Sequence, residues 1–166
     1  FDRNTFATAE RIAELCREHA ADFVVNDRAD FAMLLGAAVH LGQEDLPPDD
    51  ARRIMGTKAL IGFSTHNEWQ FRSALSAPVD YIALGPIFAT ASKNKPDPVT
   101  GTEELRRLRP LTTKPLVAIG GVTRMNAREV LEAGADSVAV IRDICGESAA
   151  AVGDAAAAWL RTVNAN

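Results

Sequence analysis

The sequence predicts an α/β domain in which parallel strands alternate with helices, and two observations support this class. Short apolar runs along the chain are continuous rather than alternating, which is typical of strands covered on both faces. Between these runs, apolar residues recur at the spacing of amphipathic helices. The chain has 166 residues, 47% of them hydrophobic, so we expect a single domain over residues 1–166.

Six apolar runs are the predicted strands, and each ends in polar or glycine residues. They cover residues 23–27, 37–42, 59–65, 79–88, 115–121 and 137–142. The predicted helices cover residues 5–19, 68–76, 102–109, 123–134 and 148–163. Asn4 or Thr5 is the expected cap of the first helix, and Gly134 is a typical helix stop.

Three links that lead into strands share a small residue followed by Asp. They read "HAADFVV", "APVDYIAL" and "AGADSVAV". A weak internal repeat suits a barrel of equivalent units, so a TIM (β/α)8 barrel is favoured over an open doubly wound sheet. Six strands are two fewer than such a barrel needs.

Composition and charge exclude several classes of function. A net charge of −4 argues against a nucleic-acid-binding surface. No apolar stretch approaches the roughly 18 residues of a membrane span. Cys16 and Cys145 lie far apart, without a Cys-x-x-Cys motif, so a reduced, cytoplasmic setting is expected.

The residues that follow the predicted strands indicate an enzyme, because active sites of parallel α/β folds gather at the carboxyl ends of strands. Asp27 and Asp45 follow consecutive strands, which lie about 4.8 Å apart in a sheet. Two carboxylates at that separation can share Mg²⁺. Spacing alone somewhat favours the alternative, a helix cap at Asp27 and a solvated loop residue at Asp45.

Two further strand-end segments carry groups that suit phosphates. The loop over 85–101 is unusually long and holds Thr90, Ser92 and Lys93, which suit a diphosphate, although a plain surface loop is equally open. Gly120 and Gly121 end a strand and would let backbone N–H groups approach a phosphate; a tight structural turn is the alternative.

The three histidines differ in context. His40 lies in an apolar run and is expected to be a packed or hydrogen-bonded core residue, whereas His66 at a strand end is an open candidate and His19 is expected to be exposed. No Ser-His-Asp or Cys-His arrangement follows from the order of residues.

Together these stretches resemble one family, thiamine phosphate synthase. The resemblance rests on "VVNDRADFAMLLGAAVHLGQEDLP", "IGFSTHN", "DYIALGPIFATASK", "VAIGGVT" and "AGADSVAVIRDI", which span residues 23–144. It implies a TIM barrel that couples hydroxymethylpyrimidine diphosphate with thiazole phosphate by a Mg²⁺-assisted dissociative substitution, giving thiamine phosphate and diphosphate. The expected partners are these two phosphorylated small molecules, and a homodimer is left open.

The resemblance also implies roles for individual residues. Asp27 and Asp45 would bind Mg²⁺, while Asn26, Ser64 and Lys93 would contact the pyrimidine diphosphate, with Ser64 and Lys93 as catalytic residues. The expected thiazole phosphate set is Thr90, Ser92, Gly120, Gly121, Ile141 and Arg142.

The start of the chain departs from the family pattern. Residues 1–16 resemble the helix that follows the second strand of the barrel, so we expect strands 1 and 2 to be missing and the barrel to be incomplete at its N-terminus. Whether this chain alone is active is left open. Two alternatives remain: a thiazole tautomerase-like barrel, and a non-catalytic remnant that binds thiazole phosphate.

Overall fold

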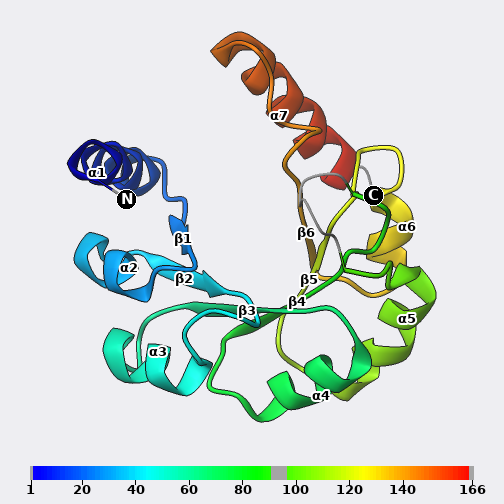
Figure 1. The fold of residues 1–166 in the computed structure, drawn as a ribbon. Helices are drawn as coiled ribbons and strands as arrows, with labels where there is room; N and C mark the ends of the chain where they lie inside the picture. Colours follow the sequence, from blue (N-terminus) through cyan, green and yellow to red (C-terminus); the bar gives the residue numbers. More distant parts are fainter. Residues whose placement is uncertain (1, 91–96, 165–166) are drawn as a thin grey trace. The chain divides into compact units, whose positions relative to one another are not determined.

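A computed structural model describes residues 2–90 and 97–164 of the chain. The chain divides into two compact units. The N-terminal unit comprises Phe1–Ser64 and Ser76–Asp80, and the C-terminal unit comprises Thr65–Leu75 and Tyr81–Asn166. Figure 1 shows their helices and strands, coloured along the sequence. The single domain expected over residues 1–166 stays a prediction.

The N-terminal unit alternates helices and parallel strands. Its elements are α1 (Arg3–Glu18), β1 (Val24–Asn26), α2 (Ala29–Leu35), β2 (Ala38–Leu41), α3 (Pro48–Met55) and β3 (Ile61–Thr65). The strands pair in chain order, with Asn26 of β1 opposite His40 of β2, and His40 opposite Gly62 of β3. In Figure 1, α2 lies between α1 and α3, and it contacts both.

The C-terminal unit repeats this alternation. Its elements are α4 (Glu68–Ser76), β4 (Tyr81–Leu84), α5 (Gly101–Leu108), a 3-10 turn η1 (Arg109–Leu111), β5 (Leu116–Ile119), α6 (Ala127–Glu132), β6 (Ser137–Ala139) and α7 (Ala149–Asn164). Its three strands are also parallel and pair in chain order, with Leu84 opposite Ala118 and Ile119 opposite Ala139. Helices α6 and α7 pack together. Among the described residues, no helix is both long and apolar enough to cross a membrane.

The predicted α/β class with parallel strands is confirmed, and burial explains why the apolar runs are continuous. In β4, the consecutive residues Ile82, Ala83 and Leu84 are all fully buried. A strand that is covered on both faces needs apolar side chains at every position rather than at every second one. Phe71 of α4 and Leu105 of α5 are also fully buried, so helices contribute to the same core.

Some predicted boundaries are wrong at helix starts. Asp2, rather than Asn4 or Thr5, caps α1: its Oδ1 accepts a hydrogen bond from the backbone N–H of Thr5 at 2.9 Å. The helix predicted from residue 123 begins at Ala127, because Asn126 Oδ1 accepts the backbone N–H of Thr123 and closes a turn there. Helices α2 and α3 were not among the predicted helical patterns.

The Asp residues of the internal repeat connect neighbouring strands at their amino ends. Asp136, before β6, accepts the N–H of Leu116 of β5 through Oδ2 at 2.8 Å and donates its own N–H to the Leu116 carbonyl at 2.9 Å. Asp80 makes the same two bonds to Ile61, both at 2.7 Å. The repeated Asp therefore fixes the register of adjacent strands.

An arginine accompanies each of these carboxylates. Arg52 of α3 pairs with Asp80 at 2.7 Å and also donates to the carbonyls of Pro78 and Ala59. Arg109 pairs with Asp136 at 3.3 Å. These contacts lie at the amino ends of the strands, the end that stabilises parallel α/β folds, and leave the opposite end for binding.

Candidate functional site

Asn26 and Asp27 lie at the carboxyl end of β1 in the N-terminal unit. Asp27 has a φ of 69°, in the left-handed region that Asp enters more readily than most residues but still at a cost. Its N–H donates to the His40 carbonyl at 2.8 Å, and Asn26 Nδ2 donates to its Oδ1 at 2.6 Å. The sharp turn holds the exposed Asp27 carboxylate where β1 ends.

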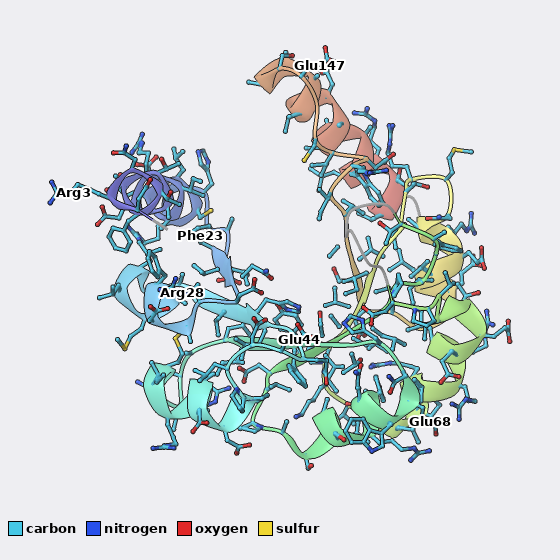
Figure 2. The ribbon with its side chains drawn as sticks, in the orientation of Figure 1. Arg3, Phe23, Arg28, Glu44, Glu68 and Glu147 are labelled. Carbon is cyan, nitrogen blue, oxygen red and sulfur yellow. The ribbon has the colours of Figure 1, made fainter. Side chains whose placement is uncertain are left out.

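Arg28 follows directly and is turned toward α2. Its guanidinium makes two hydrogen bonds to the carboxylate of Asp30 and lies 4.4 Å from the centre of the Phe31 ring. Figure 2 labels Arg28 at the start of α2. The charge of Arg28 is therefore paired with Asp30 of α2, although Arg28 directly follows Asp27 in the sequence.

The two acids after β2 differ in their surroundings. Asp45 is half-buried, and its Oδ2 accepts the backbone N–H of Gly42 at 2.6 Å. Glu44, labelled in Figure 2, is exposed. The bond to Gly42 orients the Asp45 carboxylate at the carboxyl end of β2 and leaves lone pairs of the carboxylate for other partners.

Ser64 is buried on β3 and hydrogen-bonded to His40 of β2. The distance between Ser64 Oγ and His40 Nε2 is 2.8 Å, and Gln43 Nε2 donates to the Ser64 carbonyl at 2.6 Å. Burial lowers the pKa of His40, and the negative charge of Asp45 offsets part of that effect. His40 is thus a hydrogen-bonded core residue, as predicted.

The order of residues in the sequence does not predict the contact between His40 and Ser64. His40 lies opposite Gly62, and Ser64 is two residues further along β3, so the two side chains share one face of the sheet. Strand register, which the order of residues does not reveal, brings serine, histidine and aspartate into one neighbourhood. The period-2 alternation of two adjacent strands is the signal that could have found it.

A cavity of about 450 Å³ lies at the carboxyl ends of the strands in the C-terminal unit. It is lined by backbone and apolar side chains of the segments after β4, β5 and β6. Its polar lining residues are His66, Thr90, Asp97, Thr123, Arg142 and Asp143. Its volume falls in the range of small-molecule sites, about 300–1,000 Å³.

Most of the residues predicted to hold the thiazole phosphate lie at this cavity. Thr90, Gly120, Gly121, Ile141 and Arg142 all line it. Asp143 also lines it and is paired with Arg124, whose Nε lies 3.0 Å from its Oδ2. Ser92 and Lys93 lie outside the described residues.

Gly120 and Gly121 are required by close packing. The Phe88 N–H donates to the Gly120 carbonyl at 3.1 Å, so the loop after β4 lies directly against the end of β5. With φ values of 82° and 67°, both glycines adopt the left-handed region. A Cβ at Gly121 would lie 2.7 Å from the Phe88 and Ala89 carbonyl oxygens, a distance too short for any side chain.

This packing leaves backbone donors at the cavity. Within residues 2–90 and 97–164, the N–H groups of Gly121 and Val122 donate to no protein acceptor. On the sequence alone, a structural turn and a phosphate-binding role were alternatives at Gly120 and Gly121. The two are compatible, because the turn that requires glycine also leaves N–H groups without a protein acceptor at the cavity.

His66 lies at the end of β3 with its side chain largely buried. Its Nδ1 is 2.6 Å from the Gly85 carbonyl oxygen, and its Nε2 is 3.6 Å from Asp97 Oδ2. Its backbone N–H donates to Gln70 Oε1 at 2.7 Å. His66, which the sequence left as an open candidate, thus lines the cavity. It contacts the loop after β4 at Gly85, before Thr90, and at Asp97, after it.

One unit has carboxylates at its strand ends, and the other has a cavity with polar residues at its strand ends. These features are typical of α/β enzymes that bind small molecules. Within the described residues, no three His, Cys, Asp or Glu side chains gather as a metal-binding group. A family model described as thiamine monophosphate synthase matches residues 1–144. The chain belongs to this family.

Individual relatives agree with the family match. The thiamine-phosphate synthase of Koribacter versatilis is 51% identical over 149 residues, covering 86% of this chain and 71% of the relative. That of Albidiferax ferrireducens is 44% identical over 144 residues, covering 86% of this chain and 66% of the relative. The chain therefore spans about two thirds of the length of these relatives.

A solved structure extends the likeness to the fold. The thiamine phosphate pyrophosphorylase from Pyrococcus furiosus aligns with a TM-score of 0.87 and 34% identity, covering 98% of this chain and 77% of that chain. The prediction of a thiamine phosphate synthase, a transferase, is thereby confirmed at the level of the family. The fold prediction is confirmed as an α/β fold like that of this enzyme.

Proposed function

We propose that this chain couples hydroxymethylpyrimidine diphosphate with thiazole phosphate, forming thiamine phosphate and releasing diphosphate. The observation that carries the proposal is the cavity of the C-terminal unit, because five of the six residues expected to hold thiazole phosphate line it. Family membership supports the same reaction class.

The thiazole phosphate is proposed to bind in this cavity through backbone donors. The N–H groups of Gly121 and Val122 would donate to phosphate oxygens, and the hydroxyl of Thr90 would add a side-chain donor. Apolar residues such as Ile119 and Val122 would contact the thiazole ring. This division between a polar end and an apolar wall suits a small phosphorylated heterocycle.

The pyrimidine diphosphate is proposed to bind Asn26, Ser64 and Lys93. In support, Asn26 ends β1, and Ser64 is held by His40. If His40 Nε2 donates to Ser64 Oγ, the serine hydroxyl can donate in turn to the leaving diphosphate. Lys93, outside the described residues, would add positive charge.

Asp27 and Asp45 are proposed to hold Mg²⁺, and their surroundings fit it. Magnesium needs only one or two carboxylates when substrate phosphates and water complete its shell. Each carboxylate accepts a hydrogen bond that orients it, from Asn26 to Asp27 and from Gly42 to Asp45. When bound, Mg²⁺ would neutralise charge on the departing diphosphate.

The proposed reaction is dissociative, so the protein needs no nucleophile. Diphosphate leaves the pyrimidine methylene carbon, and the thiazole nitrogen captures the resulting cation. The tasks of the chain are to stabilise the negative charge that develops on the leaving group and to align the two substrates. Ser64 and Lys93 would serve the first task, and the cavity residues the second.

We propose further that a complete barrel has two strands before β1. In support, Asp22 stands before β1 as Asp80 and Asp136 stand before β4 and β6, yet it accepts no hydrogen bond within the described residues. Among the described residues, β1 is an edge strand that pairs with β2, so its other edge is left to pair. Cytoplasmic location and a homodimer stay predictions.

Calorimetry with each substrate alone tests the proposal against its alternatives. A synthase binds thiazole phosphate, and with Mg²⁺ present it also binds the pyrimidine diphosphate. A remnant that binds only thiazole phosphate would fail with the second compound. Binding of neither compound would contradict the assignment of the cavity.

A further inference from the structure

An ion pair connects two of the turns that form the cavity of the C-terminal unit. The Nε of Arg124, in the turn after β5, lies 3.0 Å from Oδ2 of Asp143, in the turn after β6. The backbone N–H of Arg124 donates to the same oxygen at 3.3 Å. Asp143 lines the cavity, whereas Arg124 does not, and their side chains are 22% and 43% exposed. Arg124 therefore contacts the cavity lining without forming part of it.

The turn after β5 is also closed by hydrogen bonds that do not involve Asp143. Asn126 Oδ1 accepts the backbone N–H of Thr123 at 2.8 Å, and Asn126 Nδ2 donates to the Gly121 carbonyl at 3.2 Å. These bonds hold the turn at the cavity from within. Loss of the ion pair should therefore change the charge at the cavity more than the shape of this turn.

The carboxylate of Asp143 would oppose the ligand proposed for this cavity if it were unpaired. Two anions repel each other, and the repulsion is stronger at a partly buried site than in bulk water. Among the described residues, the other charged residues that line the cavity are Asp97 and Arg142, one of each sign. Within the same residues, Arg124 is the cation that pairs with Asp143. The balance of charge at the cavity therefore depends on this pair.

We propose that Arg124 is a positioning residue that neutralises Asp143 and so makes the cavity compatible with a dianionic phosphate ester. Arg124 acts through the carboxylate rather than by contact with the ligand. The inference rests on the proposed function, since it concerns the same cavity. It follows that removal of the Arg124 charge alone should weaken binding, whereas removal of both charges should not.

Calorimetry of thiazole phosphate binding to the parent chain, Arg124→Gln, Asp143→Asn and the double variant tests this inference. Arg124→Gln leaves the Asp143 carboxylate unpaired, so we expect binding about tenfold weaker at low ionic strength. Asp143→Asn should bind at least as tightly as the parent, because it leaves a positive charge and keeps an oxygen that can accept from Arg124. The double variant should return to within about threefold of the parent.

This pattern separates the effect of charge from that of a structural connection. If the pair only held the two turns together, both single variants would weaken binding and the double variant would not recover it. That pattern, or unchanged binding by Arg124→Gln, would overturn the inference. The loss in Arg124→Gln should also shrink as salt is added, because ions screen the repulsion, and an equal loss at low and high ionic strength would overturn it.

Asp143→Asn decides the question if Arg124→Gln does not fold. Thermal unfolding of each variant shows whether it folds. Binding by Asp143→Asn at least as tight as that of the parent supports the inference, and weaker binding overturns it.

Arg128→Gln is the matched control. Arg128 lies on α6, pairs with Glu132 and is 84% exposed, and it does not line the cavity. The variant removes the same charge from the same unit, so it should bind thiazole phosphate as the parent does. A loss equal to that of Arg124→Gln would mean that net charge rather than Asp143 is responsible, and would overturn the inference.

The failures of the two proposals are distinguishable. Equal binding of thiazole phosphate by the parent and Arg124→Gln would overturn the inference and leave the cavity assignment intact. If thiazole phosphate does not bind the parent chain, the cavity assignment fails, and sulfate, a smaller dianion, tests the inference with the same variants. If sulfate also binds no form of the chain, the inference fails with the assignment.

Discussion

Asp136 and Leu116 are joined by two reciprocal hydrogen bonds, from the N–H of each residue to an oxygen of the other, at 2.9 and 2.8 Å. The same pair of bonds joins Asp80 to Ile61. In both cases a carboxylate accepts the first N–H of a buried strand, a group that would otherwise lack a partner. This repeated contact predicts where the fold is most sensitive away from the site.

Asp80→Ala should destabilise the chain by about 2 kcal/mol, because the N–H of Ile61 would lose its acceptor and the guanidinium of Arg52 would lose its ion-pair partner. Asp80→Asn, which keeps an acceptor oxygen but no charge, should cost less. Urea unfolding of both variants measures the difference. Equal stability of Asp80→Ala and the parent chain would contradict the role given to this carboxylate.

Gly121→Ala should be more destabilising than Gly36→Ala, by roughly 1–3 kcal/mol. Both glycines have positive φ, 67° and 61°, so the backbone strain is matched. Only at Gly121 would the new Cβ meet carbonyl oxygens at 2.7 Å, whereas nothing lies within 4 Å at Gly36. Thermal unfolding of the two variants makes the comparison, and equal costs would show that the loop after β4 does not pack on Gly121.

The neutral form of His66 should carry its hydrogen on Nδ1. The acceptor at Gly85 dictates this tautomer. NMR of chain labelled with ¹⁵N-histidine distinguishes the two ring nitrogens at high pH, with the exposed His19 as an internal reference for an unconstrained ring. A ring protonated at Nε2 alone would contradict the hydrogen bond from Nδ1 to the Gly85 carbonyl.

Features that depend on residue type, such as the buried strands, were predicted best from the sequence. Features that depend on strand register or on the choice of one hydrogen-bond partner were predicted least well. Continuous apolar runs such as Ile82–Leu84 located the buried strands, because complete burial removes every polar side chain from them. The cap at Asp2 and the turn that delays α6 to Ala127 depend on which of several nearby polar residues makes the bond. Composition leaves that choice open.

The candidate site shows the same division. Strand-end position alone pointed to Asp27, Asp45 and Gly120–Gly121, all of which lie at carboxyl ends of strands in the structure. The contact of His40 with Ser64, and the place of His66 between Gly85 and Asp97, depend on pairing between strands and on a loop that returns to the sheet. Such contacts join residues between 19 and 31 positions apart, which no local pattern encodes.

The role proposed for the carboxylates at the ends of β1 and β2 is to serve the release of diphosphate. Its most direct test is formation of thiamine phosphate from the two substrates with Mg²⁺, measured for the parent chain, Asp27→Asn, Asp45→Asn and the exposed control Glu44→Gln. We predict turnover by the parent chain and by Glu44→Gln that chelation of Mg²⁺ abolishes, and a loss of at least about 100-fold in either Asp variant, since each removes a charge that acts on the leaving group. Unchanged turnover in both Asp variants would contradict the role proposed for these two carboxylates.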